Sequence, residues 1–225
     1  MACTSGHVVD IYMEVLCRIS FLLPLYRLAD PIKTIDGVGC TCIVQGEDAD
    51  GYGSLMGCLT LVLGGARSGK SRYAESLVKA APAPWGYVAT AQALDEEMSE
   101  RIAHHIARRA ESWQTIEAPL AVAAALRQAG EMPVLVDCLT LWLTNLMLGE
   151  HNIEALVGEL ETVLKQRQGM TVLVSNEVGY GIVPADALAR RFRDEAGRLN
   201  QRMAALADQV VLVVAGLPVS VKSAL

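Results

Sequence analysis

The sequence lacks the features of membrane proteins and nucleic-acid-binding proteins. Spanning a bilayer takes about 20 apolar residues in a row, and the nearest candidate, residues 11–26, is interrupted by Glu14, Arg18 and Pro24. No basic segment precedes this stretch, although a secretory signal would need one. A basic excess is also missing, because 25 acidic side chains outnumber 19 basic ones, whereas nucleic-acid binding usually needs a positive surface. We therefore expect a cytoplasmic protein that binds neither membrane nor nucleic acid.

The cysteines have no spacing typical of a zinc site. Cys40 and Cys42 are separated by one residue, and no second pair follows at a ligand-like distance. Residues 1–55 contain most of the cysteines, an excess of acidic side chains and the glycine-bearing acidic segment 47–54, a composition typical of a linker. We expect residues 1–55 to be a poorly ordered or accessory N-terminal extension, followed by the main domain over residues 56–225.

One segment fits the motif G-x-x-x-x-G-K-[ST] at every fixed position. It consists of Gly64, Gly65, Ala66, Arg67, Ser68, Gly69, Lys70 and Ser71. An apolar run precedes it and a helix-favouring stretch follows, as the motif requires. The glycines would let backbone N–H groups and a helix N-terminus approach a polyphosphate, Lys70 would reach the β- and γ-phosphates, and Ser71 would hold Mg²⁺. The motif therefore predicts a phosphate-binding loop (P-loop) rather than a chance glycine-rich turn.

Short apolar runs alternate with helical patterns through the rest of the chain. We expect strands at residues 59–63, 86–90, 134–137, 171–175 and 210–214, and helices at residues 71–80, 96–108, 120–129, 140–148, 154–167 and 186–206. This alternation predicts an α/β fold of the P-loop (RecA-like) class, with a mostly parallel sheet and helices on both faces. The pattern does not give the order of the strands.

Two expected strands end in polar residues that could reach a nucleotide. Asp137 closes the run 134–137, and an acid at the end of a neighbouring strand can hold Mg²⁺ in a P-loop fold. The alternative role for Asp137 is to cap the next turn. Residues 176–184 follow the next strand at the same carboxyl edge, where ligands bind in open α/β sheets. The basic cluster at residues 191–201 could meet a phosphate, a neighbouring subunit or only solvent.

His104 and His105 lie on different faces of the expected helix 96–108. A neutral imidazole, with a pKa of about 6.5, is a competent nucleophile toward phosphorus near neutral pH. Spacing alone favours structural roles, because His104 falls on the charged face and His105 on the apolar face. Both histidines nevertheless remain candidate nucleophiles.

Further segments, in fixed order, resemble those of a known family: the bifunctional adenosylcobinamide kinase/adenosylcobinamide-phosphate guanylyltransferases of cobalamin biosynthesis. The segments are the P-loop, Ala-Thr-Ala-Gln at 89–92, Asp-Glu-Glu-Met at 95–98, Arg-Ile-x-x-His at 101–105, Trp113, Glu117, Asn-Glu-Val-Gly-x-Gly-Ile-Val-Pro at 176–184 and Phe-Arg-Asp-x-x-Gly-Arg-x-Asn-Gln at 192–201. The resemblance covers about residues 59–214.

This resemblance implies two reactions. Adenosylcobinamide would be phosphorylated from ATP or GTP, and GMP from GTP would then be joined to that phosphate with release of pyrophosphate. A histidine carries GMP covalently in the family, which implies His105 as the nucleophile here, with His104 as runner-up. Beside the P-loop, the implied nucleotide-binding residues are Ala89, Thr90, Ala91, Ile106, Ala107, Arg108, Arg109, Glu117 and Asp137. Ser71 and Asp137 would hold Mg²⁺, and the family also implies a homotrimer.

Two other functions are compatible with the same residues. One is a P-loop kinase for another small hydroxyl substrate, in which both histidines are structural. The other is a nucleotide-dependent binding module that uses residues 1–55 as a partner arm. Covalent GMP on the protein would exclude the first, and turnover of adenosylcobinamide would exclude the second.

Overall fold

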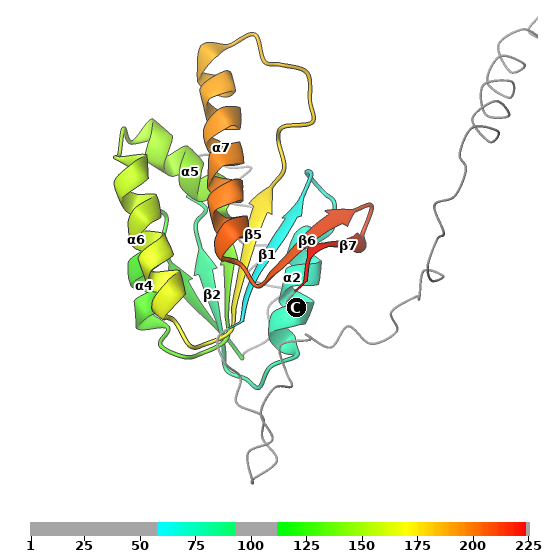
Figure 1. Cartoon of the computed structure of the whole chain (residues 1–225). Coiled ribbons are helices and arrows are strands. Elements are labelled where there is room, and N and C mark those ends of the chain that lie inside the picture. Colours follow the sequence, from blue (N-terminus) through cyan, green and yellow to red (C-terminus); the bar gives the residue numbers. More distant parts are fainter. Residues whose placement is uncertain (1–57, 93–111, 224–225) are drawn as a thin grey trace, which may run out of the picture. The chain divides into compact units, whose positions relative to one another are not determined.

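The structure is a computed structural model that describes residues 58–92 and 112–223. Within these residues one seven-stranded sheet has the order β3-β2-β4-β5-β1-β6-β7 (Figure 1). The strands are β1 (Leu59–Gly64), β2 (Trp85–Ala89), β3 (Trp113–Glu117), β4 (Val134–Asp137), β5 (Thr171–Asn176), β6 (Gln209–Val214) and β7 (Leu217–Lys222). Neighbouring strands are parallel except β6 and β7, which are antiparallel. The expected mostly parallel sheet is confirmed, whereas the expected extension, residues 1–55, lies outside the described residues.

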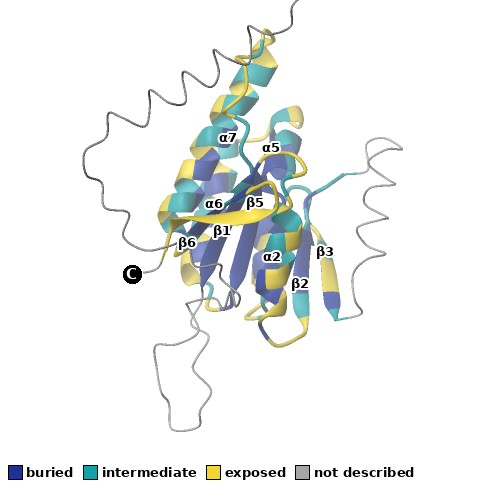
Figure 2. Ribbon diagram, turned by 90° about the vertical axis from the view of Figure 1, so that its right-hand side faces the viewer, coloured by how far each residue is buried: buried dark blue, intermediate teal, exposed yellow. Residues whose placement is uncertain are grey.

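Helices cover both faces of the sheet, as expected. They are α2 (Lys70–Lys79), α4 (Val122–Gln128), α5 (Leu139–Leu148), α6 (Ile153–Gln166) and α7 (Ala187–Leu206). In Figure 2, α2 lies in front of the sheet while α5, α6 and α7 lie behind it. Successive residues of β1 show why both faces need cover: Leu61 packs in the cluster beneath α4–α7, and Val62 packs in the cluster beneath α2. A strand buried on both sides is largely apolar along its whole length, which is why the sequence revealed it.

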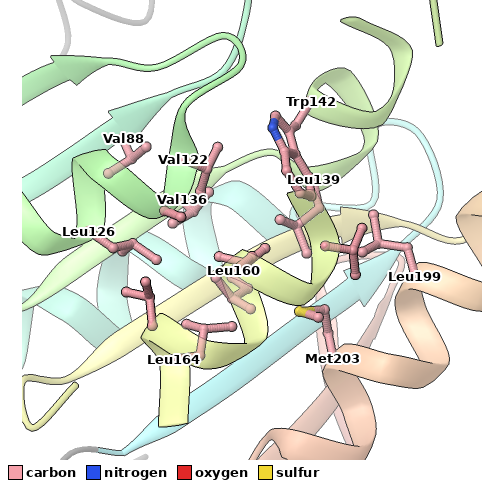
Figure 3. Close-up of a cluster of buried hydrophobic side chains, with 14 of the residues drawn as sticks. Val88, Val122, Leu126, Val136, Leu139, Trp142, Leu160, Leu164, Leu199 and Met203 are labelled. Carbon is pink, nitrogen blue, oxygen red and sulfur yellow. The ribbon is translucent and has the colours of Figure 1, made fainter. Parts of the chain in front are cut away.

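The larger core joins α4–α7 to the sheet. Figure 3 shows its side chains converging from several elements: Val88, Val122, Leu126, Val136, Leu139, Trp142, Leu160, Leu164, Leu199 and Met203. Each buried leucine contributes about 1.5–3 kcal/mol, and Trp142 also donates its indole N–H to the Leu120 carbonyl oxygen at 2.8 Å. This packing gives a rigid base to the loops that leave the sheet at its carboxyl edge, the edge where the parallel strands end. Among the described residues no helix has both the length and the apolar character needed to cross a membrane.

Candidate active site

The P-loop connects β1 to α2, and its glycines have separate physical reasons. A Cβ atom at Gly64 would lie 2.5 Å from Ser68 Oγ and 2.7 Å from the Val213 carbonyl oxygen, so a side chain there would displace backbone. Gly69 has a φ of 94°, a conformation that other residues rarely adopt, and it precedes the first residue of α2. Glycine is therefore required at both of these fixed motif positions.

The N-terminus of α2 adjoins the P-loop and is suited to an anion. Its N-cap residue, Gly69, contributes no side-chain hydrogen bond, and the first turn holds no acidic residue. The positive end of the helix dipole is thus left for a ligand. Lys70 Nζ donates to the Gly65 carbonyl oxygen at 3.3 Å in an exposed contact, which folds the ammonium over the loop. Backbone amides, a helix N-terminus and a cation together favour phosphate.

Asp137 ends β4, in register with Ala89 of β2 and Val174 of β5. Tyr87 donates its hydroxyl hydrogen to Asp137 Oδ2 at 3.0 Å, which restrains the carboxylate. The neighbouring Cys138 thiol is influenced by both sides of the site: burial raises its pKa to about 11, the Asp137 charge adds to the rise, and the Lys70 charge opposes it. The helix that begins at Lys70, α2, packs against β4, which ends at Asp137, so both charged residues lie at the same part of the carboxyl edge.

Ser71 and Asp137 suit a nucleotide-bound Mg²⁺ better than a metal enclosed by protein. In the part of the chain that the structure describes, no three His, Cys, Asp or Glu side chains gather into a metal site. Mg²⁺ in nucleotide sites is held by one or two protein oxygens together with phosphates and water. A hydroxyl and a carboxylate are donors of this kind, so the donor chemistry fits and their role stays a prediction.

Thr90 follows β2 and is fully buried. Its hydroxyl donates to the Cys138 carbonyl oxygen and accepts from the Cys138 N–H, both at 2.8 Å. Asn145 Nδ2 in turn donates to the Thr90 carbonyl oxygen at 2.8 Å. Thr90 therefore ties the ends of β2 and β4 together, so its hydroxyl could contact a nucleotide only by giving up these bonds. The other expected nucleotide contacts that the structure describes at this edge are the partly or fully exposed Ala89, Ala91 and Glu117.

The two late motifs meet through a pair of asparagines. Asn176 ends β5 in register with Gly64, and Asn200 of α7 donates its amide N–H to the Asn176 carbonyl oxygen at 3.1 Å. The Oδ1 atoms of both residues are buried and have no hydrogen-bond partner among the described residues. Buried polar atoms without partners are rare and indicate a missing water or ligand. The pair therefore extends the polar rim of the site beyond the P-loop.

The basic residues of α7 are largely engaged with their neighbours. Arg193 pairs with Asp194 at 2.9 Å, and Arg198 pairs with Glu195 at 2.8 Å. Of the interpretations open from the sequence, these contacts favour a solvated helix face over a phosphate site.

The β6–β7 turn also borders the P-loop, and the sequence reasoning missed it. The Gly216 N–H donates to the Ser68 carbonyl oxygen at 2.8 Å. The local signal was weak, because Gly216 between two apolar stretches is compatible with a turn, whereas Ala215 is not a typical residue of a two-residue hairpin loop. That pattern predicts a turn, but it says nothing of a contact with a loop so distant in sequence.

The remaining predicted residues fall on the segment between β2 and β3. His104, His105, Ile106, Ala107, Arg108 and Arg109 lie outside the described residues. Their roles stay predictions.

Comparisons with known proteins agree with the P-loop architecture. The family model described as cobinamide kinase / cobinamide phosphate guanyltransferase matches residues 60–221. The chain is 52% identical over 167 residues to the bifunctional adenosylcobalamin biosynthesis protein CobP of Pseudomonas aeruginosa, a match that covers 72% of this chain and 96% of that protein. It is 44% identical over 181 residues to the bifunctional adenosylcobalamin biosynthesis protein CobU of Salmonella typhimurium, covering 73% of this chain and 99% of that protein. The corresponding CobU of Escherichia coli is 42% identical over 182 residues, with 73% and 99% covered. The chain therefore belongs to the cobinamide kinase / cobinamide phosphate guanyltransferase family.

Proposed function

We propose that a single nucleotide site, built on the P-loop, serves both reactions of this family. Membership makes the chain a bifunctional enzyme of adenosylcobalamin biosynthesis, a cobinamide kinase and cobinamide phosphate guanyltransferase. ATP or GTP would donate the phosphoryl group in the first reaction, and GTP would donate GMP in the second. The observation that carries the proposal is the P-loop at the head of α2, inside the segment that matches the family.

In the kinase reaction the P-loop would bind the triphosphate through its amides and the α2 N-terminus. Lys70 would neutralise the β- and γ-phosphates as the γ-phosphoryl group passes to the hydroxyl of adenosylcobinamide. Ser71 and Asp137 would hold Mg²⁺, which supplies charge neutralisation on the phosphates. Tyr87 restrains Asp137 for this role through its hydrogen bond of 3.0 Å.

In the guanylyl reaction an imidazole would attack the α-phosphorus of GTP. A nitrogen–phosphorus bond forms, the bond from the α-phosphorus to the bridging oxygen breaks, and pyrophosphate leaves with that electron pair. An oxygen of adenosylcobinamide phosphate then displaces the imidazole, giving adenosylcobinamide-GDP. The family resemblance supports His105 as this nucleophile, with His104 as runner-up. The nucleotide would also be contacted by residues 106–109, Ala89–Ala91, Glu117 and Asp137.

A two-step assay with adenosylcobinamide, ATP and GTP tests the shared site. Lys70→Ala should lower both phosphoryl and guanylyl transfer by about 100-fold or more, because charge stabilisation of the transition state is lost. Lys79→Ala is the matched control: this lysine lies at the other end of α2 and, among the described residues, pairs with Glu75 at the surface at 3.7 Å. Loss of one activity with full retention of the other in Lys70→Ala would contradict a shared site.

Labelling separates the two histidines. GTP labelled at the α-phosphate should leave acid-labile label on the wild-type protein and on His104→Ala but not on His105→Ala. The reverse pattern would transfer the role to His104, and no label on any of the three proteins would refute a covalent intermediate. This labelling also distinguishes the bifunctional enzyme from a plain small-molecule kinase.

We also propose that the protein acts as a homo-oligomer in the cytoplasm, a trimer by family resemblance. Large apolar side chains are exposed in the loop after β5 and on β6 and β7: Tyr180, Ile182, Val183, Val214, Leu217, Val219 and Val221. Exposed large apolar side chains in such number are compatible with association sites. Analytical ultracentrifugation should show a trimer, and a monomer at micromolar concentration would contradict the proposal.

A further inference from the structure

The β6–β7 turn consists of Ala215 and Gly216, and both residues have left-handed backbones, with φ of 51° and 83°. Two central residues with positive φ are typical of a type I′ hairpin turn. Every residue of β7 is exposed, so this strand, unlike the largely buried β6, adds little to the hydrophobic core. Stabilising the core is therefore a poor explanation for β7 and the turn, and the contact of the turn with the P-loop suggests another role.

The turn meets the P-loop backbone to backbone. The Gly216 N–H donates to the Ser68 carbonyl oxygen at 2.8 Å. A Cβ atom built on Gly69 would lie 3.3 Å from Gly216 Cα and 3.9 Å from Gly216 N. The strand leading into the turn is equally close, because a Cβ on Gly64 would lie 2.7 Å from the Val213 carbonyl oxygen. The P-loop is thus bordered on one side by β6 and its turn.

This contact falls at the part of the P-loop that sets the direction of its amides. Gly69 is the N-cap of α2 and has a φ of 94°, and Ser68 comes just before it. Within the loop, the Ser68 N–H donates to the Gly65 carbonyl oxygen at 3.3 Å, which is longer than the bond from Gly216. The shorter bond comes from outside the loop, so the turn supplies a restraint that the loop does not provide for itself.

We infer that the β6–β7 turn is a positioning element that holds the P-loop in its phosphate-binding conformation. A loop that is ordered before the ligand arrives loses less entropy on binding, so the turn acts on nucleotide affinity. The same restraint is present in the ground state and the transition state, so KM should change and kcat should change little. The inference rests on the proposed role of the P-loop in both reactions.

Gly216→Ala tests the turn, and Gly130→Ala is its matched control. Both glycines have positive φ, 83° at Gly216 and 56° at Gly130, and a Cβ on either would meet no atom within 4 Å. Each substitution therefore introduces backbone strain without a clash. Gly130 lies between α4 and β4, where the parallel strands begin, at the end of the sheet opposite to the P-loop. Gly216→Asn is the conservative variant, because asparagine tolerates a left-handed backbone better than alanine.

Calorimetry with Mg²⁺ and non-hydrolysable analogues of GTP and ATP should show Kd raised about tenfold in Gly216→Ala. Gly130→Ala should keep the wild-type Kd although its melting temperature falls, and Gly216→Asn should recover most of the affinity. Steady-state assays of both reactions should show the change in KM. Equal Kd values in Gly216→Ala and Gly130→Ala would overturn the inference and leave the turn a merely structural feature.

A measurement on the unaltered protein covers the case in which Gly216→Ala does not fold. Amide hydrogen exchange at Gly216 should slow when the GTP analogue binds, and exchange that ignores the nucleotide would overturn the inference. Lys70→Ala distinguishes a failure of the proposed nucleotide site from a failure of the proposed role of the turn. Unchanged nucleotide affinity in Lys70→Ala would refute the proposed site itself, whereas lost affinity there with wild-type affinity in Gly216→Ala would refute only the role of the turn.

Discussion

The parallel strands begin at one edge of the sheet, the amino edge, and end at the other, the carboxyl edge. The two edges differ in how far their polar groups have hydrogen-bond partners. At the amino edge, where the strands begin, the Arg167 guanidinium donates to Thr171 Oγ1 and to the carbonyl oxygens of Leu126, Gly130 and Met132. Asp208 Oδ2 similarly accepts from the N–H of Leu59, the first residue of β1, at 2.8 Å. These contacts join the starts of β1 and β5 and the entry to β4 to their neighbours. The amino edge is therefore built for stability.

The carboxyl edge retains polar atoms that the described residues do not satisfy. Ser68 Oγ, Asn176 Oδ1 and Asn200 Oδ1 are buried there without a hydrogen-bond partner. Trp113 Nε1 is the remaining such atom in the described part of the chain, and it lies at the start of β3. Since unpaired buried polar groups cost stability, their gathering around the P-loop indicates an edge shaped for a ligand. The two edges of one sheet thus separate contacts that stabilise the fold from the polar groups of the proposed site.

Arg167→Ala gives the largest expected effect on stability and tests that separation. Burial lowers the pKa of Arg167 to about 10, which shows that desolvation opposes its charge, yet its removal would leave several backbone carbonyls without a donor. We expect a loss of about 3 kcal/mol in the free energy of unfolding, and hence a melting temperature lower by roughly 6–12 °C. Nucleotide affinity of the folded fraction should be unchanged.

Urea unfolding and calorimetry with a GTP analogue check both halves of this prediction. Lys165→Ala, at an exposed position near the end of α6, is the control and should change stability by less than about 0.5 kcal/mol. A raised Kd for nucleotide in Arg167→Ala would show that the amino edge communicates with the site and would break the comparison.

The sequence predicted those strands that are buried on both faces of the sheet and missed those that are exposed. Central strands such as β1 and β5 are covered on both faces, so their apolar runs identified them to within a residue or so. The two strands that were missed, β3 and β7, are the edge strands of the sheet. Four of the five residues of β3 are not buried, and none of β7 is buried, so neither has the continuous apolar run that identified the central strands. Pro218 in β7 further argues against a strand, although proline is compatible with an edge position.

The candidate site divides in the same way. The P-loop and Asp137 were predicted because motif and strand end are local features of the chain. The contact between Gly216 and Ser68, and the clamp formed by Thr90 on Cys138, depend on strand order, which periodicity does not give. The apolar residues of α7 show a further limit. Leu188, Ala196, Leu199 and Met203 recur at helical spacing and so share one face, but Ala196, Leu199 and Met203 are buried, whereas Leu188 at the start of the helix is 53% exposed. Periodicity predicts which residues share a face, whereas tertiary structure decides how much of that face is covered.

Ala215→Asn should give a smaller effect of opposite sign and would sharpen the comparison. The left-handed position at the amino edge is occupied by Gly130, whereas the carboxyl edge places Ala215 at a φ of 51°. Alanine in this conformation is strained by about 1–2 kcal/mol, and asparagine is favoured at this turn position. We expect a gain of about 0.5–1 kcal/mol in the free energy of unfolding.

Thermal unfolding checks this gain, with Ala124→Asn as control. Ala124 is exposed within α4, where the same substitution should lower stability by about 0.5 kcal/mol. A stability decrease in Ala215→Asn as large as in the control would mean that the turn is not strained.

The smallest expected effect concerns Glu161 and Arg202, which join α6 to α7 away from both edges. Arg202 Nε donates to Glu161 Oε1 at 2.6 Å and Arg202 Nη1 donates to Glu154 Oε2 at 2.7 Å. The hydrogen bond from Arg202 holds the pKa of Glu161 below its ordinary value, against the opposing effect of burial. Since the folded pKa lies below the unfolded one, the pair stabilises the fold above the unfolded pKa of about 4.3 and loses this contribution as the pH falls through the folded pKa.

Comparing Glu161→Gln with the wild type in urea unfolding should therefore show a stability difference at neutral pH that shrinks on acidification. The difference should stay below about 1 kcal/mol, because solvent screens a partly exposed pair. Glu154→Gln is the control: the Glu154 side chain is 81% exposed, so its difference should be smaller at every pH. If the Glu161→Gln difference instead grew as the pH fell, the folded pKa would lie above the unfolded one. The ionised Glu161 carboxylate would then destabilise the fold.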